Sequence, residues 1–267
     1  MKRISFLLAM LALALGVAGC SNGSVETIDV STAAELKAAF EGITDSGDYL
    51  INIKAPLTIT EAMTLNTGAN VTVKGASNPT EISSSVNGVF WANAGKITVE
   101  NLRITGGAGL VAVENGTIEM KNGVSVIGTG SGNNGIFVGN TGAFIMSGGT
   151  IEGFGSGLLS SSWRETINGK ITISGGIIRN CEAGINLGEN TSNSTLTVSG
   201  GDISGTAAGI VISGSNNTVT ISGGKVSGGT IGIWVAAGSG HTVRKTGGTV
   251  TGDYGIADGA QATFTGF

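Results

Sequence analysis

Two pairs of oppositely charged residues occupy matching places in successive glycine-rich segments of the chain. Asp202 and Lys225 each follow a double glycine directly, and Glu152 and Arg179 lie two residues further on in two other segments. Carboxylates beside a basic side chain could bind Ca²⁺ and exchange a proton, which is the chemistry that cleaves an acidic polysaccharide. Calcium sites need several clustered carboxylates, however. We therefore favour the other interpretation, exposed ion pairs that each contribute under ~1 kcal/mol.

The double glycines recur at a regular interval. Aligned on the middle residue of the motif Ser/Thr-Gly-Gly, they are 23 to 27 residues apart. The aligned positions are Gly148, Gly175, Gly200, Gly223 and Gly247. The surrounding segments are alike, as in "TLTVSGGDISGTAAGIVI" from Thr195 and "TVTISGGKVSGGTIGIWV" from Thr218. Self-similarity of this period indicates a solenoid.

Each repeat holds three short runs of β-branched or alternating residues, separated by Gly, Asn and Ser. Three strand signals bounded by turn residues predict one coil of a parallel β-helix, with three short strands per coil of 23 to 27 residues. Successive coils would pair their backbones about 4.8 Å apart. Glycine would lie at corners, where the chain takes positive φ or passes close to its neighbour. Because β crossovers favour one hand, we expect right-handed winding.

The repeats from about Asp48 to the end resemble the right-handed β-helix proteins of the pectate-lyase-like superfamily. This resemblance implies an all-β solenoid, and it adds carbohydrate-active enzymes, both lyases and hydrolases, to the functions to be considered. The segment "TAAELKAAFEGITDSGDYLINI" is also similar to β-helix lipoproteins of spirochaetes. That second group is uncharacterised, so the similarity implies a location more than an activity.

The residues before the repeats predict a helix that caps the solenoid. Thr32 is followed three residues later by Glu35, which is a capping-box signature. Ala33, Leu36 and Phe40 fall on one helical face. We expect an amphipathic helix over about residues 33–42 that covers the open backbone groups of the first coil. The alternative is a helix packed on the side of the stack.

The third run of each repeat carries apolar residues where outward-facing positions are usually polar. The predicted outward column is Phe90, Val111, Phe137, Leu159, Asn186, Val211, Trp234 and Ala257, with inward neighbours from Val89 and Trp91 to Ile233 and Val235. A continuous apolar stripe is typical of a contact surface, unless a loop covers it or it merely stabilises the face. With two residues of the long loop "LLSSSWRETING", it forms a candidate binding face of Phe90, Val111, Phe137, Leu159, Trp163, Arg164, Val211 and Trp234.

The first segment, "MKRISFLLAMLALALGVAGC", predicts export and lipidation. Lys2 and Arg3 precede an apolar run and small residues, as in a secretory signal. The end of this segment, residues 17–20, resembles the lipobox of bacterial lipoproteins. The resemblance implies cleavage before Cys20 and a diacylglycerol on its thiol. Ser21, in place of the Asp that retains many lipoproteins at the inner membrane, implies an outer-membrane anchor facing the periplasm or the cell surface.

Composition and single motifs exclude several classes of function. With 14 basic and 18 acidic residues, the chain is acidic and a poor candidate for binding nucleic acid. Gly130-x-Gly132-x-x-Gly135 has no following helix, so we expect a turn and no dinucleotide cofactor. His241 is the one histidine and has no partner ligand at metal spacing, so we expect no metal site. Once Cys20 is acylated, Cys181 is left without a disulfide partner.

The sequence thus predicts four segments. They are a lipoprotein signal peptide at 1–19, a lipidated tether at 20–29, a capping helix and turn at 30–47, and a parallel β-helix at 48–267. The segment "GAQATFTGF" begins a further coil without a second cap, which favours end-to-end self-association through that edge. We expect a binding or adhesion module for a glycan or protein partner. A polysaccharide lyase or glycoside hydrolase is the alternative, and an envelope spacer is the third class.

Overall fold

The computed structural model describes residues 25–77, 79–107, 109–161 and 168–267. The predicted signal peptide and Cys20 lie outside the described residues. No helix among the described residues is long and apolar enough to cross a membrane.

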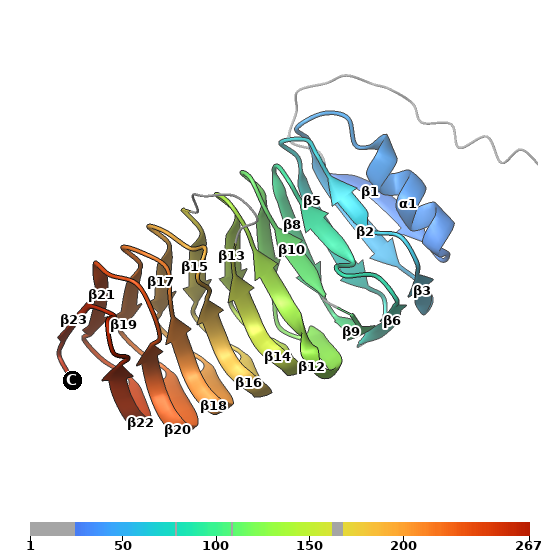
Figure 1. The fold of residues 1–267 in the computed structure, drawn as a ribbon. Helices are drawn as coiled ribbons and strands as arrows, with labels where there is room; N and C mark the ends of the chain where they lie inside the picture. The colour runs from blue at the N-terminus through green and yellow to red at the C-terminus, as the bar shows by residue number, and fades with distance from the viewer. Residues whose placement is uncertain (1–24, 78, 108, 162–167) are drawn as a thin grey trace, which may run out of the picture.

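The described chain forms a parallel β-solenoid of about ten turns, as the repeats predict (Figure 1). The first strand of every coil belongs to one sheet, here called the first face. In chain order and spatial order its strands are β1 Glu26–Val30, β2 Asp48–Ile53, β5 Asn70–Gly75, β8 Lys96–Glu100, β11 Thr117–Met120, β13 Ala143–Met146, β15 Lys170–Ile173, β17 Thr195–Val198, β19 Thr218–Ile221, β21 His241–Lys245 and β23 Ala262–Thr265. The strand β1 extends the sheet into residues 26–29, which the sequence assigns to the tether.

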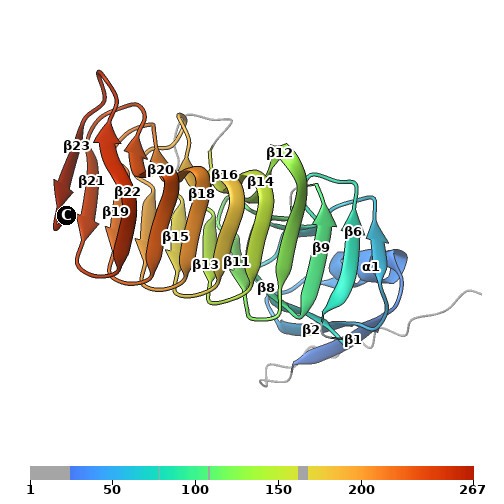
Figure 2. The same ribbon diagram turned by 90° about the horizontal axis from the view of Figure 1, so that it is seen from below.

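The other two faces are separate in the early coils and continuous in the later ones. The early second-face strands are β3 Leu57–Ile59, β6 Thr80–Ser84 and β9 Leu102–Gly106, and the early third-face strands are β4 Met63–Leu65, β7 Phe90–Ala92 and β10 Leu110–Ala112. Six long strands then follow both faces around a bend: β12 Ser125–Val138, β14 Thr150–Ser160, β16 Ile177–Leu187, β18 Asp202–Ile212, β20 Lys225–Val235 and β22 Thr249–Ile256 (Figure 2). The first half of β12 pairs with β9 and its last residues pair with β10, which shows that one strand spans two faces.

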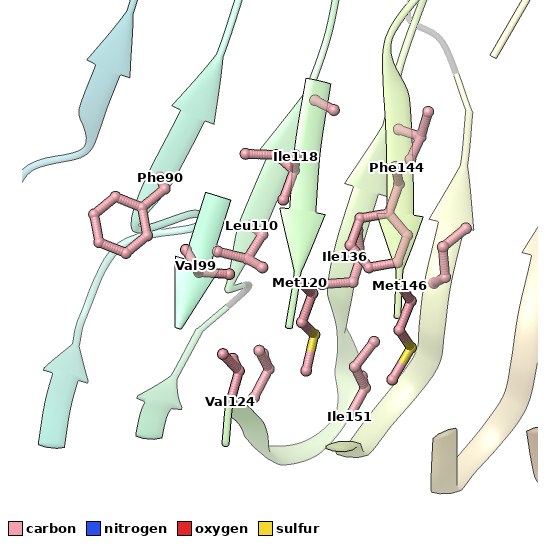
Figure 3. Packing of buried hydrophobic residues seen from close by; sticks show 14 of the residues in the cluster. Phe90, Val99, Leu110, Ile118, Met120, Val124, Ile136, Phe144, Met146 and Ile151 are labelled. Carbon is pink, nitrogen blue, oxygen red and sulfur yellow. The ribbon is translucent and has the colours of Figure 1, made fainter. Parts of the chain in front are cut away.

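Columns of like side chains fill the interior. Met120 pairs in register with Met146, and Ile118 pairs with Phe144, all of them fully buried (Figure 3). Because each inward residue lies directly over its counterpart in the next coil, the core is a stack of aligned layers.

The corner after the first face requires glycine. Gly224 has a φ of +71°, and a Cβ there would lie 2.6 Å from the carbonyl carbon and oxygen of Gly200 in the preceding coil. Any larger residue would push the two coils apart. Next to this corner, serine hydroxyls donate to carbonyl oxygens of the preceding coil, as from Ser222 Oγ to Val198 O at 3.4 Å.

The helix α1, Ala33–Gly42, caps the N-terminal end of the stack as predicted. The Thr32 hydroxyl accepts from the Glu35 N–H at 3.2 Å. The Glu35 carboxylate accepts from the N–H groups of Ser31 and Thr32, and these hydrogen bonds hold its pKa below the ordinary value. On the inner face Phe40 stacks on Phe90, with ring centroids 5.9 Å apart. The helix thus covers the first coil rather than the side of the stack (Figure 1).

The opposite end leaves core positions uncovered. Tyr254 and Ile256 continue the inward columns of Ile233 and Val235, yet they are 52% and 41% exposed. The rings of Tyr254, Phe264 and Phe267 form a cluster with centroid separations of 5.0 to 5.4 Å. No described residue pairs with the outer edges of β22 and β23.

We expect two copies to associate through these edges, because unpaired strand edges and apolar side chains favour continued pairing. Sedimentation of the non-acylated Cys20→Ser chain should show a concentration-dependent dimer. The double variant Tyr254→Lys and Ile256→Lys should stay monomeric, because buried like charges oppose contact. Ile177→Lys, at an equally exposed isoleucine in the middle of the stack, is the control and should still associate. A wild-type chain that is monomeric at every concentration would contradict the prediction.

Candidate functional site

The third face carries the predicted outward column, with one error at each end. Phe90 is wrongly placed, because it is fully buried in register with Leu110. Trp91 takes the outward position beside Val111, and its indole Nε1 donates to Gly88 O at 3.1 Å. The inward assignment of Trp91 is wrong for the same reason. The ring of Phe40 needs an apolar partner inside the first coils, whereas an indole N–H needs an acceptor.

From Val111 to Trp234 the column is in register as predicted, and the predicted last member, Ala257, is wrong. The residues Val111, Phe137, Leu159, Asn186, Val211 and Trp234 occupy equivalent places in successive coils. Gly255, not Ala257, follows Trp234. Val111 is buried, and Trp234 is half-buried because its ring lies over Gly255. The apolar stripe is therefore interrupted by Asn186, and it is buried at Val111 and only partly exposed at Trp234.

Two residues of the predicted binding face, Trp163 and Arg164, lie outside the described residues.

Two hollows lie beside this column, where the long strands bend from the second face to the third. The first has a volume of about 320 Å³ and is lined by Gly132, Asn133, Asn134, Gly155, Ser156, Glu182, Ala183, Asn186, Ala207, Ala208 and Val211. The second has a volume of about 560 Å³ and is lined by Gly128, Thr129, Gly130, Gly153, Phe154, Asn180, Cys181, Glu182 and Thr206. Both hollows cross β12, β14, β16 and β18, and both are lined by Glu182. We call the two together the bend groove.

Small residues and unusual backbone angles create the bend groove. Gly153 and Asn180 have φ of +82° and +53°, which turns the chain without ending the strand. The pairing register of β16 with β18 shifts on both sides of Cys181, at the same bend. Beyond it, Gly155, Ala183 and Ala208 leave the surface hollow because they carry at most a methyl group.

The bend groove was missed in the sequence. Its signal is the alignment of four segments of small and amide residues, "GTGSGNNG" from Gly128, "GFGSG" from Gly153, "NCEAG" from Asn180 and "GTAAG" from Gly205. Each segment resembles an ordinary loop by itself. Only the stacking of the coils shows that their short side chains line one depression.

The charged pairs with which the sequence analysis began are ladder neighbours on the second face, as we favoured. Arg179 Nε lies 2.8 Å from Glu152 Oε2, and Lys225 Nζ lies 3.8 Å from Asp202 Oδ2. Both basic side chains are at least half exposed. Such pairs contribute under ~1 kcal/mol each. Within the described ranges, no group of three or more His, Cys, Asp or Glu side chains could hold a metal ion.

His241 and Cys181 are both buried in the β-helix. His241 is buried, accepts from the Asn217 N–H at Nδ1, and lies with Nε2 3.0 Å from Ala237 O. Asn217 in turn donates to Thr191 Oγ1 at 2.9 Å, so the imidazole belongs to a buried polar corner. Burial raises the pKa of the Cys181 thiol, which keeps it protonated and a poor nucleophile.

Comparison with known proteins identifies the fold. No protein-family model and no curated protein sequence matches the chain significantly. Among solved structures, the chain is similar to an alginate lyase from Paenibacillus sp. str. FPU-7, with 14% sequence identity and a TM-score of 0.50. The match covers 90% of this chain and 98% of that one. The similarity shows that the two chains share a parallel β-helix fold.

Proposed function

We propose that this protein is a carbohydrate-active β-helix protein that holds a linear polysaccharide in the bend groove. The observation that carries the proposal is the course of the groove across four successive coils, from β12 to β18. Coils about 4.8 Å apart offer hydrogen-bonding groups at regular spacing, which suits a ligand that itself repeats. The structural neighbour supports this proposal, because by its name it is a lyase that acts on a polysaccharide.

Within the groove, Glu182 is the group suited to proton transfer. It is exposed, it lines both hollows, and it projects from the bend of β16, the third of the four coils. The amide side chains of Asn133, Asn134 and Asn186 lie along the same floor and can position sugar hydroxyls. A carboxyl group so placed can act as a general acid or base during cleavage of a bound polysaccharide.

Glu182→Gln should keep polysaccharide binding and lower cleavage by roughly 10²–10⁴-fold, the usual contribution of a general acid or base. The assay incubates the purified protein with a panel of linear polysaccharides. New reducing ends measure cleavage, and ultraviolet absorbance of unsaturated uronic ends distinguishes elimination from hydrolysis. Glu189→Gln, an exposed carboxylate in the turn after β16, is the matched control and should cleave normally. Equal cleavage by wild type and Glu182→Gln would rule out this role.

A second candidate function is binding of a glycan or protein without cleavage, in an adhesion module. The observation that favours it is the outward column beside the groove, in which Phe137 and Leu159 are adjacent in register, Asn186 follows, and Val211 and Trp234 are adjacent beyond it. Aromatic and aliphatic side chains that are aligned along the stack, one from each coil, can pack against a long ligand. On this proposal the column, rather than Glu182, carries most of the affinity.

The column is tested by the double substitution Phe137→Ser and Trp234→Ser, with binding measured by calorimetry against the ligand found in the panel. We expect the dissociation constant to rise by at least about tenfold, because buried aromatic anchors dominate binding energy. Thermal unfolding should remain cooperative, since both side chains point away from the core. Ile145→Ser, at an outward isoleucine of the first face, is the control. Undiminished binding by the double variant would exclude the column as a contact surface.

We further propose that the protein is held in the cell envelope by a lipid on Cys20, on the outer membrane and facing the periplasm or the surface. The support is the signal-like segment that ends at Cys20, followed by Ser21. A single acyl chain binds a membrane only weakly, so stable anchoring needs more than one chain. A diacylglycerol on the thiol supplies this.

Metabolic labelling with a radioactive fatty acid should mark the wild-type protein and leave Cys20→Ala unlabelled. Wild type should sediment with membranes, and the variant should appear in the soluble fraction. Cys181→Ala serves as the control, because its thiol lies in the β-helix core, and it should be labelled normally. Labelling of Cys20→Ala would contradict the proposal.

A further inference from the structure

The charge of the bend groove bears on which polysaccharide it accepts. Among the described residues that line the two hollows, Glu182 is the one acidic side chain. These described lining residues include no lysine, arginine or histidine. The rest of it consists of amides, hydroxyls, glycine and apolar groups.

The nearest cations in the sequence of these strands are occupied elsewhere. Arg179, three residues before Glu182 on β16, hydrogen-bonds through Nε to Glu152 at 2.8 Å. Lys225, one coil beyond β18, lies 3.8 Å from the carboxylate of Asp202. Both pairs stand on the second face, before the bend. They therefore leave the negative charge of Glu182 uncompensated within the groove.

Three amide side chains of the first hollow are uncommitted. Asn133, Asn134 and Asn186 are partly exposed, and none of their side chains hydrogen-bonds another residue in the described part of the chain. A primary amide both donates and accepts, as a sugar hydroxyl does. Val211 adds an apolar contact at the edge of the first hollow. This combination matches an uncharged ligand with many hydroxyl groups.

We propose that the bend groove selects a neutral linear glycan and excludes polyuronates such as alginate. The proposal rests on the proposed function and specifies its substrate class. A polyuronate carries one carboxylate on every sugar, so several would lie within the screening length of Glu182, about 8 Å at physiological ionic strength. With no cation among the described lining residues, each would be repelled and would lose part of its hydration without a partner. A neutral glycan avoids both costs.

The test uses the mature protein and linear hexasaccharides of matched length, titrated by calorimetry. The neutral probes are cellohexaose, mannohexaose and laminarihexaose, and the anionic probes are hexamers of guluronate and galacturonate. At least one neutral hexamer should bind, with an affinity insensitive to salt. The anionic hexamers should bind at least about tenfold more weakly at low salt, which corresponds to ~1.4 kcal/mol of repulsion.

Substitution of Glu182 should change this preference in a graded way. Glu182→Gln should reduce the difference in binding affinity between neutral and anionic hexamers. Glu182→Lys should make the anionic hexamers bind more tightly than the neutral ones. Glu189→Gln, which removes a carboxylate outside the groove, should leave this difference in affinity unchanged. Cooperative thermal unfolding of each variant confirms that the fold is intact.

Two results would overturn the inference, and they differ in what they imply. If the anionic hexamers bind as tightly as the neutral ones or more tightly, with or without added Ca²⁺, the selectivity is wrong while the polysaccharide function stands. If no hexamer of either class binds, the proposed function fails and the selectivity fails with it.

Discussion

The parallel backbone ladder between successive coils is the interaction on which the whole structure depends. A single coil cannot bury its inward face, so each coil is stable only when paired with its neighbours. The ladder fixes which residues lie one above another, from the threonines of the first face to the isoleucines of the core. Glycine at the corner permits the close approach that the ladder requires, as the contact of Gly224 with Gly200 shows. At each end of the stack the last coil lacks one neighbour. At the N-terminal end the helix α1 covers the open backbone groups, whereas the opposite end exposes Tyr254 and Ile256.

The ladder also aligns short segments of neighbouring coils, so that together they form a surface depression. A short segment of glycine, alanine and asparagine has no shape by itself. Repeated in register across β12, β14, β16 and β18, such segments form a depression with a carboxylate at Glu182 and amides along its floor. The outward column beside it arises in the same way, because one residue per coil, apolar in every coil from Val111 to Trp234 except at Asn186, is aligned by the ladder. Recognition of a long repeating ligand is consistent with this construction, in which the site has the same periodicity as the fold.

Much of the architecture could be predicted from local patterns, because those patterns report on backbone geometry. The capping box at Thr32 and Glu35 specifies where the helix begins, and the double glycines specify the corners. The ladder pair of Glu152 and Arg179 follows directly from alignment of the repeats. The early coils were less predictable. Their repeats are degenerate, so Phe90 and Trp91 can exchange roles by a shift of one residue, and only the ring of Phe40 from the cap decides which aromatic faces inward.

The sequence by itself determined the solenoid, its repeat, its cap and the order of side chains along each column, because hydrogen-bonded coils with inward apolar residues follow from periodicity and turn chemistry. The tertiary structure decided where the second and third faces join, which of two adjacent aromatics is buried, and where the surface is hollow. These properties depend on how the side chains of several successive coils pack together. The bend groove exists because the small residues of four strands meet at one bend. Glu182 is the one charged side chain among its described lining residues, because the neighbouring ion pairs lie on the face before it.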